Sequence, residues 1–68
     1  MILSANHVEQ LRGGGHVLLW LPEQRARELR AGEKLDTDPL PTEVVSVRAI
    51  PTYSTNMRGV TVRKWGAA

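Results

Sequence analysis

The chain has 68 residues, of which 41% are hydrophobic, with no cysteine and a formal net charge of +2. We expect one small domain, residues 1–68, with a frayed tail over 66–68. The lack of cysteine excludes a disulfide scaffold and thiolate metal sites, and it is compatible with the reducing cytoplasm, where we place the protein. The longest apolar run, 17–21, is far shorter than the roughly 20 residues of a membrane span, so no membrane association is predicted.

The first predicted element is a two-turn helix over 5–12. Ser4 is a favoured N-cap residue, and Leu3 and Val8 occupy the positions of a hydrophobic staple. Gly13 suits the left-handed position that follows a helix. The glycine triplet that begins there leads from a helix into a strand, the reverse of a phosphate-binding loop, and no Gly-Lys-Ser/Thr follows. We therefore interpret the triplet as a cap and a turn.

A strand and a second helix are expected next. Residues 17–21 are apolar at both the odd-numbered and the even-numbered positions, which is typical of a strand covered on both faces. Residues 23–31 are rich in helix formers, and Gly32 is the natural end of this helix. Only Ala26 and Leu29 would face inward, so the helix has a narrow apolar stripe and depends on docking.

The second half of the chain predicts turns and two further strands. Residues 36–42 have turn composition, and the side chains of Asp36 and Asp38 are suited to bond neighbouring backbone amides. In a strand over 43–50, successive side chains should point to alternate faces of the sheet. One face would carry Val45, Val47 and Ala49, and the other Ser46 and Arg48. In the last strand, 60–65, one face would carry Val60 and Val62, and the other Thr61, Arg63 and Trp65.

These elements predict an α+β fold with a small three-stranded, mostly antiparallel sheet packed by two short helices. The segment between the first two strands is compatible with a right-handed parallel crossover, and the last two strands should be antiparallel. The alternative is a small, partly open β-barrel with the helices reduced to single turns. The predicted core residues are Leu3, Val8, Leu11, Val17, Leu19, Leu21, Leu29, Leu35, Val45, Val47, Val60 and Val62.

No catalytic or metal-binding constellation is apparent. His7 and His16 are too few, without cysteine, for a zinc site. Asp36 and Asp38 lack the further oxygen ligands of a calcium loop. Ser4, Ser46 and Ser54 do not lie in a nucleophile elbow. We therefore predict no enzyme activity, no cofactor, no metal and no small-molecule substrate.

The arginines of the second predicted helix do not indicate a DNA-recognition helix. Arg25, Arg27 and Arg30 are interleaved with Glu23, Glu28 and Glu33, whose charges would repel a phosphate backbone. A solvated, salt-bridged helix is the better interpretation.

The basic excess lies near the C-terminus, because residues 43–68 hold four cations against Glu43 alone. Such asymmetry is compatible with an anionic partner. Arg63 and Trp65 should share a sheet face with Arg48 of the neighbouring strand. Tryptophan beside arginine is typical of single-stranded nucleic-acid binders and of protein-interface hot spots. A Trp65 that simply covers the sheet, with Arg63 stacked on it, is a third interpretation and the one that the usual burial of tryptophan favours. The candidate interaction face consists of Arg48, Tyr53, Arg58, Arg63, Lys64 and Trp65.

The sequence favours a non-enzymatic protein-binding accessory or regulatory domain, and the small size alone suggests a phage or mobile-element protein. A partner protein or self-association is expected because a chain this short builds a small core. The alternative is a nucleic-acid-binding module that uses the basic-aromatic face. No motif is specific enough to assign a family.

Overall fold

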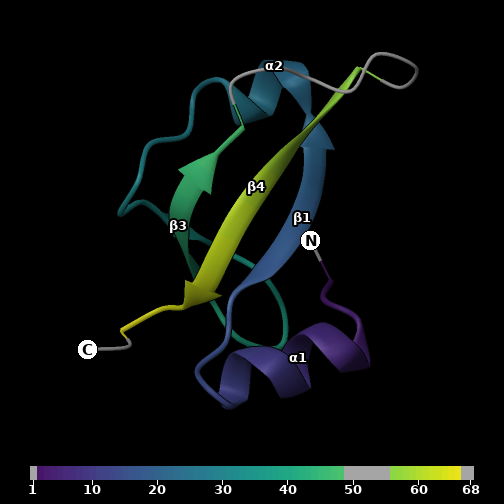
Figure 1. The fold of residues 1–68 in the computed structure, drawn as a ribbon, viewed down its shortest axis with the longest axis vertical. Helices are drawn as coiled ribbons and strands as arrows, with labels where there is room; N and C mark the ends of the chain where they lie inside the picture. Colours follow the sequence, from purple (N-terminus) through teal and green to yellow (C-terminus); the bar gives the residue numbers. More distant parts are fainter. Residues whose placement is uncertain (1, 49–55, 67–68) are drawn as a thin grey trace.

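The computed structural model describes residues 2–48 and 56–66, and within them the chain forms a curled antiparallel sheet with one short helix and one helical turn (Figure 1). The elements are α1 (Ala5–Arg12), β1 (Val17–Pro22), α2 (Glu23–Ala26), β2 (Lys34–Leu35), β3 (Thr42–Val47) and β4 (Met57–Lys64). The strand order is β1-β4-β3-β2. Figure 1 shows α1 at one end of the sheet and α2 at the other.

The predicted α+β class is confirmed, and the predicted strand count is wrong. The two-residue strand β2 pairs with β3 and adds a fourth strand. Two residues carry too little hydrophobic pattern to be recognised as a strand. The last two long strands, β3 and β4, are antiparallel as predicted. β1 and β3 run in the same direction but do not pair, because β4 lies between them. The curled sheet resembles half a barrel. In this respect it is close to the alternative prediction of a partly open β-barrel.

Helix α1 has the predicted bounds, with its end cap shifted by one residue. The Oγ of Ser4 accepts a hydrogen bond from the amide of His7 at 3.2 Å, as expected of an N-cap. The amide of Gly13 still donates to the carbonyl of Glu9 at 3.1 Å, which continues the helical bonding. Gly13 therefore keeps a negative φ of −78°, and Gly14 takes the left-handed conformation with φ of 87°.

Helix α2 is a single turn, much shorter than the predicted 23–31. Beyond it, the amides of Glu28 and Leu29 donate to residues three positions earlier, the pattern of a tightened turn. Ala26 is the only buried residue of α2, so little apolar contact supports a longer helix. Gly32, with φ of 93°, then turns the chain, and its amide bonds the Val44 carbonyl at 2.8 Å.

The segment before β3 is organised by a threonine, and the predicted role of the aspartates is wrong. The Thr37 hydroxyl lies 2.8 Å from the carbonyl oxygen of Leu40 and 3.0 Å from the Thr42 hydroxyl. Thr37 and Thr42 are both buried. Asp36 and Asp38 are exposed, and their carboxylates accept no hydrogen bond within the described residues. The Asp38–Pro39 peptide bond is cis.

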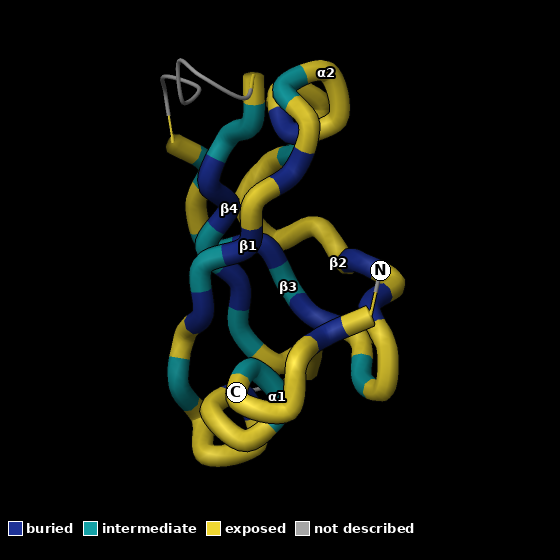
Figure 2. Tube along the Cα trace, turned by 90° about the vertical axis from the view of Figure 1, so that its right-hand side faces the viewer, coloured by how far each residue is buried: buried dark blue, intermediate teal, exposed yellow. Residues whose placement is uncertain are grey.

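The core lies on one side of the curled sheet, where β1 buries alternate residues and β4 buries Val60 and Val62 (Figure 2). In β3 the register shifts between Val44 and Ser46, so that Val45 is the extra residue of a β-bulge. The bulge places Val44 in the core, with 1% exposure, and leaves Val45 half-buried. The predicted core position of Val45 is therefore wrong. The buried hydrophobic residues are Leu3, Leu11, Val17, Leu19, Leu21, Ala26, Leu35, Val44, Val60 and Val62.

The remaining predicted core residues lie at its margin. Val8, Leu29 and Val47 are partly buried and pack against the core cluster. The predicted positions of Ala49 and Tyr53, and the tail residues 67–68, lie outside the described residues.

Candidate binding face

The side of the sheet opposite the core carries the candidate site. Side chains alternate across a strand, so the residues between the buried ones point to this side. Leu35 is buried, and its neighbour Lys34, which pairs with Glu43, therefore lies on the same side as Glu43. We call this side the outer face; its residues are Leu18, Trp20, Lys34, Glu43, Ser46, Arg48, Gly59, Thr61 and Arg63.

One end of the outer face is built around Trp20. Trp20 pairs with Gly59 of β4, and the amide of Arg48 donates to the Gly59 carbonyl at 2.9 Å, which brings three strands together at this point. The guanidinium carbon of Arg48 lies 5.5 Å from the centroid of the Trp20 ring. Trp20 nevertheless remains 44% exposed. A cation at this distance from an indole is attracted by the ring's quadrupole.

The other end of the outer face meets Trp65, which directly follows β4. The Trp65 amide donates to the Pro41 carbonyl at 3.2 Å, which continues the β3–β4 ladder by one step. The Nζ of Lys34 lies 5.8 Å from the Trp65 ring centroid. Trp65 is 41% exposed, so it does not act as a buried lid over the sheet.

Between the two tryptophans, Arg63 is held by a carboxylate. Its Nη2 lies 3.1 Å from Oε2 of Glu43, the residue that faces it across the β3–β4 ladder. Lys34 flanks Glu43 on the other side, so the three charges alternate across the strands. The Nε of Arg63 is buried and has no hydrogen-bond partner among the described residues.

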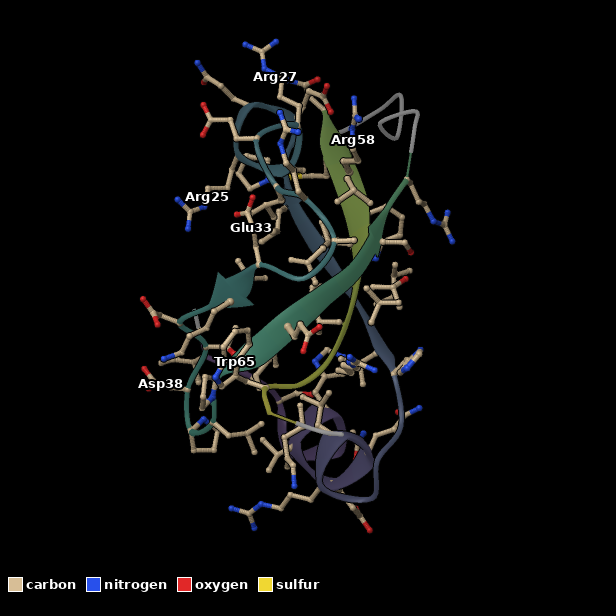
Figure 3. The ribbon with its side chains drawn as sticks, turned by 90° about the vertical axis from the view of Figure 1, so that its left-hand side faces the viewer. Arg25, Arg27, Glu33, Asp38, Arg58 and Trp65 are labelled. Carbon is tan, nitrogen blue, oxygen red and sulfur yellow. The ribbon has the colours of Figure 1, made fainter. Side chains whose placement is uncertain are left out.

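Arg58 belongs to a different region from the rest of the predicted face. Its guanidinium forms two hydrogen bonds to the carboxylate of Glu23, the first residue of α2, and both side chains are largely buried. Arg58 lies near the start of β4 and Trp65 directly follows its end, and Figure 3 shows the two residues well separated. Lys64 pairs with the buried Thr42, so it lies on the opposite side of the sheet from Arg63. Tyr53 lies outside the described residues.

The predicted grouping of Arg48, Arg63 and Trp65 is therefore spread along the sheet. Arg48 is bonded to Gly59, and Gly59 and Arg63 are four positions apart along the strand, or about 13 Å. The aromatic partner of Arg48 is Trp20, which the sequence did not place on this face. The signal was the alternation of Leu19, Trp20 and Leu21, which an unbroken apolar run conceals.

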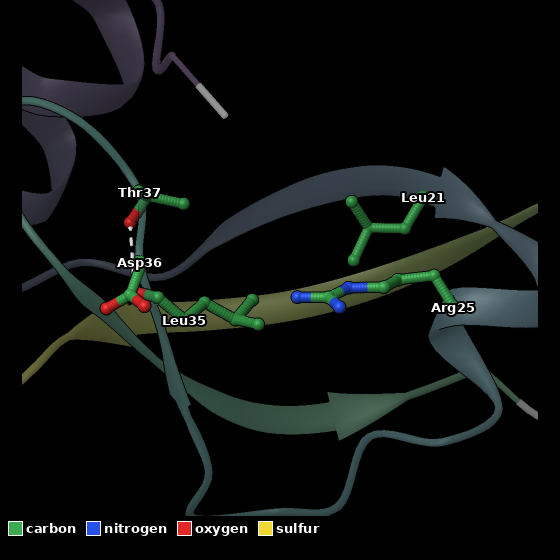
Figure 4. Close-up of a pocket in the computed structure, with 5 residues that line it drawn as sticks. All are labelled: Leu21, Arg25, Leu35, Asp36 and Thr37. Carbon is green, nitrogen blue, oxygen red and sulfur yellow. Dashed lines mark hydrogen bonds between the residues drawn. The ribbon is translucent and has the colours of Figure 1, made fainter.

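Among the hollows in the described part of the chain, two are formed by residues outside the outer face. Leu21, Arg25, Leu35, Asp36 and Thr37 line a cavity of about 200 Å³ between α2 and β2, and the Arg25 side chain extends into it beside Leu21 (Figure 4). The second, of about 530 Å³, is an open apolar groove along α1 lined by residues that include Leu3, Val8 and Pro39. Over residues 2–48 and 56–66, no three His, Asp or Glu side chains are grouped to hold a metal ion.

Comparison with known proteins identifies no relative: no family model, curated protein or solved structure matches the chain significantly. None of the helices in the described part of the chain has the length and apolar character needed to cross a membrane. A function must therefore be inferred from the geometry of the outer face.

Proposed function

We propose that this protein is a non-enzymatic protein-binding domain, and that the outer face is its binding surface. The proposal rests on one observation: Trp20 and Trp65 are 44% and 41% exposed at the two ends of this face, each beside a cation. Tryptophan and arginine are the residues most enriched in the energetic centres of protein interfaces. A partner that covers both rings would remove a large apolar area from water.

The charges of the outer face suit an acidic partner. Lys34, Arg48 and Arg63 are opposed only by Glu43 on this face. Arg63 is already paired with Glu43, so the matching partner surface would carry carboxylates for Lys34 and Arg48 and apolar side chains for the tryptophans. The centre of the face, at Leu18, Ser46 and Thr61, carries no charge and can lie against uncharged backbone.

Selection of displayed peptides tests the proposal. A library rich in acidic and apolar residues is panned against the intact chain, and binding of the selected peptides is measured by fluorescence titration. Trp65→Ala and Arg48→Ala should each weaken binding by about tenfold or more, as expected of hot-spot residues. Ile2→Ala is the matched control, because Ile2 is 84% exposed and is not one of the outer-face residues. Selected peptides that bind all three variants equally would refute the proposal.

A nucleic-acid-binding module is the second candidate, because cation–aromatic pairs on an open sheet also suit single strands. It is less favoured, since Arg58 and Arg63 already neutralise Glu23 and Glu43. Titration with labelled oligonucleotides at low salt tests it. Binding should weaken steeply as salt rises, and Trp65→Ala should reduce single-strand binding more than duplex binding. No signal at low salt would eliminate this candidate.

A further inference from the structure

The free edge of β1 exposes backbone groups whose direction can be worked out from the ladder bonds. The Glu23 amide donates to the Asn56 carbonyl at 3.0 Å, one step beyond the Pro22–Met57 pair. In an antiparallel pair, hydrogen-bonded and non-bonded positions alternate. Odd-numbered residues of β1 therefore bond β4, and even-numbered residues point away from it. The Arg48–Gly59 bond agrees, since it directs the backbone of Gly59 towards β3 and not towards Trp20.

The even-numbered residues whose backbone groups point away from β4 are His16, Leu18, Trp20 and Pro22. The first and last of them cannot offer a full set of free groups to another strand. The His16 carbonyl accepts a hydrogen bond from Nε2 of Gln10 at 3.2 Å. Pro22 has no amide hydrogen. Within residues 2–48 and 56–66, no hydrogen bond reaches the outward groups of Leu18 or Trp20. Figure 2, which looks at the molecule from this side, shows no other element in front of β1.

The free edge of β1 lacks the features that normally prevent an edge strand from pairing with another chain. The strand reads Val-Leu-Leu-Trp-Leu-Pro, with no charge, and its proline is at the end. Natural edge strands are blunted by lysine, by internal proline, by bulges or by a covering element. An uncharged edge with two free amides and two free carbonyls is suited to accept another strand.

We propose that the occupant of this edge is a second copy of the same strand, paired antiparallel about a twofold axis at Leu19. In that register Leu18 faces Trp20 of the second copy, and all four free backbone groups of each edge are satisfied. A twofold at Leu18 would require the His16 carbonyl that Gln10 already occupies. A twofold at Trp20 would place Leu18 opposite Pro22, which cannot donate. Of these three registers, only the one with the twofold axis at Leu19 pairs every free amide and carbonyl of one copy with those of the other.

The side chains support the same register. Leu18 and Trp20 of the two copies meet on the outer face as aliphatic–aromatic cross-strand pairs, which stabilise sheets. Leu19 meets its own copy on the core side, and no like charges are brought together. The two curled sheets become one continuous sheet, in which the exposed Trp20 gains a neighbour. This inference rests on the β1 edge and is independent of the proposed function.

Amide hydrogen exchange followed by NMR at increasing protein concentration tests the proposal, with light scattering to report the mass. The Leu18 and Trp20 amides should exchange rapidly in dilute protein and become protected at high concentration, in parallel with a doubling of mass. The Leu19 and Leu21 amides, which bond β4, should be protected throughout. Exchange at Leu18 and Trp20 that is independent of concentration, or a mass that stays monomeric up to millimolar protein, would overturn the proposal.

A backbone variant separates strand pairing from other association. N-methylation of Leu18 in a synthetic chain removes two intermolecular hydrogen bonds per dimer and should weaken dimerisation by about tenfold or more. N-methylation of Gln24, whose amide lies in the first turn of α2, is the matched control and should change nothing. Protection of the Leu21 amide reports that each variant is folded. A dimer whose stability is equal in the two N-methylated chains would show that β1 is not the interface.

Discussion

The guanidinium carbon of Arg48 lies 5.5 Å from the centroid of the Trp20 ring. This approach is possible because the residue between them, Gly59, has no side chain. A Cβ atom on Gly59 would lie 3.0 Å from Cδ of Arg48 and 3.0 Å from Cδ1 of Leu18. Both atoms belong to flexible side chains that can move aside. Gly59 therefore serves the geometry of the outer face more than the stability of the fold.

We predict that Gly59→Ala separates Arg48 from Trp20 while leaving the fold intact. The unfolding free energy should change by less than about 1 kcal/mol, since alanine in a strand regains about 0.5–1 kcal/mol relative to glycine. In a Trp65→Phe background, acrylamide quenching of Trp20 fluorescence should increase. Arg48→Ala should increase the quenching to a similar extent. Unchanged quenching in both variants would show that Arg48 does not shield the indole.

The two ion pairs should differ in their contribution to stability. The side chains of Arg58 and Glu23 are 16% and 20% exposed, and the pair joins α2 to β4, whereas Arg63 is 40% exposed in its pair with Glu43. Glu23→Gln should lower the unfolding free energy by about 1–2 kcal/mol, because it leaves a largely buried guanidinium without its counter-charge.

Glu43→Gln is the matched variant and should cost less than about 1 kcal/mol. Urea denaturation followed by circular dichroism measures both changes. In a domain of this size, 1 kcal/mol corresponds to a shift in Tm of about 4–8 °C. Equal losses in the two variants would mean that burial does not distinguish the pairs.

The β-bulge predicts opposite outcomes for two adjacent valines. Val44 is 1% exposed, whereas Val45 is the extra, half-buried residue of the bulge. Val44→Ala should cost about 2 kcal/mol, at about 0.8 kcal/mol for each buried carbon removed plus a cavity contribution. Val45→Ala should cost less than about 1 kcal/mol. The reverse order would be the result expected if β3 alternated regularly, as the sequence pattern indicates.

The same bulge shows where the sequence stops being informative. The Ser4 cap, the apolar run of β1 and the alternation of Val60 and Val62 are local signals, and the elements that they predict are present. A bulge arises from the fit between two strands, and nothing in the residues around Val44 marks it. The early end of α2 likewise depends on packing, because Ala26 is its one buried residue and Leu29 lies only at the margin of the core.

The outer face was predictable only in part, for a related reason. Alternation placed Arg48 and Arg63 on one face, and the structure agrees. The Glu43 and Glu23 partners of the arginines depend on strand register and on the packing of α2, which the sequence alone does not give. Trp20 was hidden because every residue of 17–21 is apolar, so no polar residue marks the outward positions.

The buried threonine pair provides the last prediction. The Thr37 hydroxyl lies 2.8 Å from the Leu40 carbonyl and 3.0 Å from the Thr42 hydroxyl. Thr37→Val keeps the shape but leaves buried polar groups without a partner, so it should cost about 1–3 kcal/mol. Thr61→Val on the outer face is the control and should be within about 0.5 kcal/mol of the parent.

The double variant Thr37→Val/Thr42→Val distinguishes a coupled pair from two separate contacts. Each single change already breaks the contact between the two hydroxyls, whereas the double change removes both hydroxyls together. The loss in the double variant should therefore be smaller than the sum of the single losses by about 0.5 kcal/mol or more. Urea denaturation of the four proteins completes the cycle. Strictly additive losses would show that each hydroxyl acts through the backbone alone and that the contact between them contributes nothing.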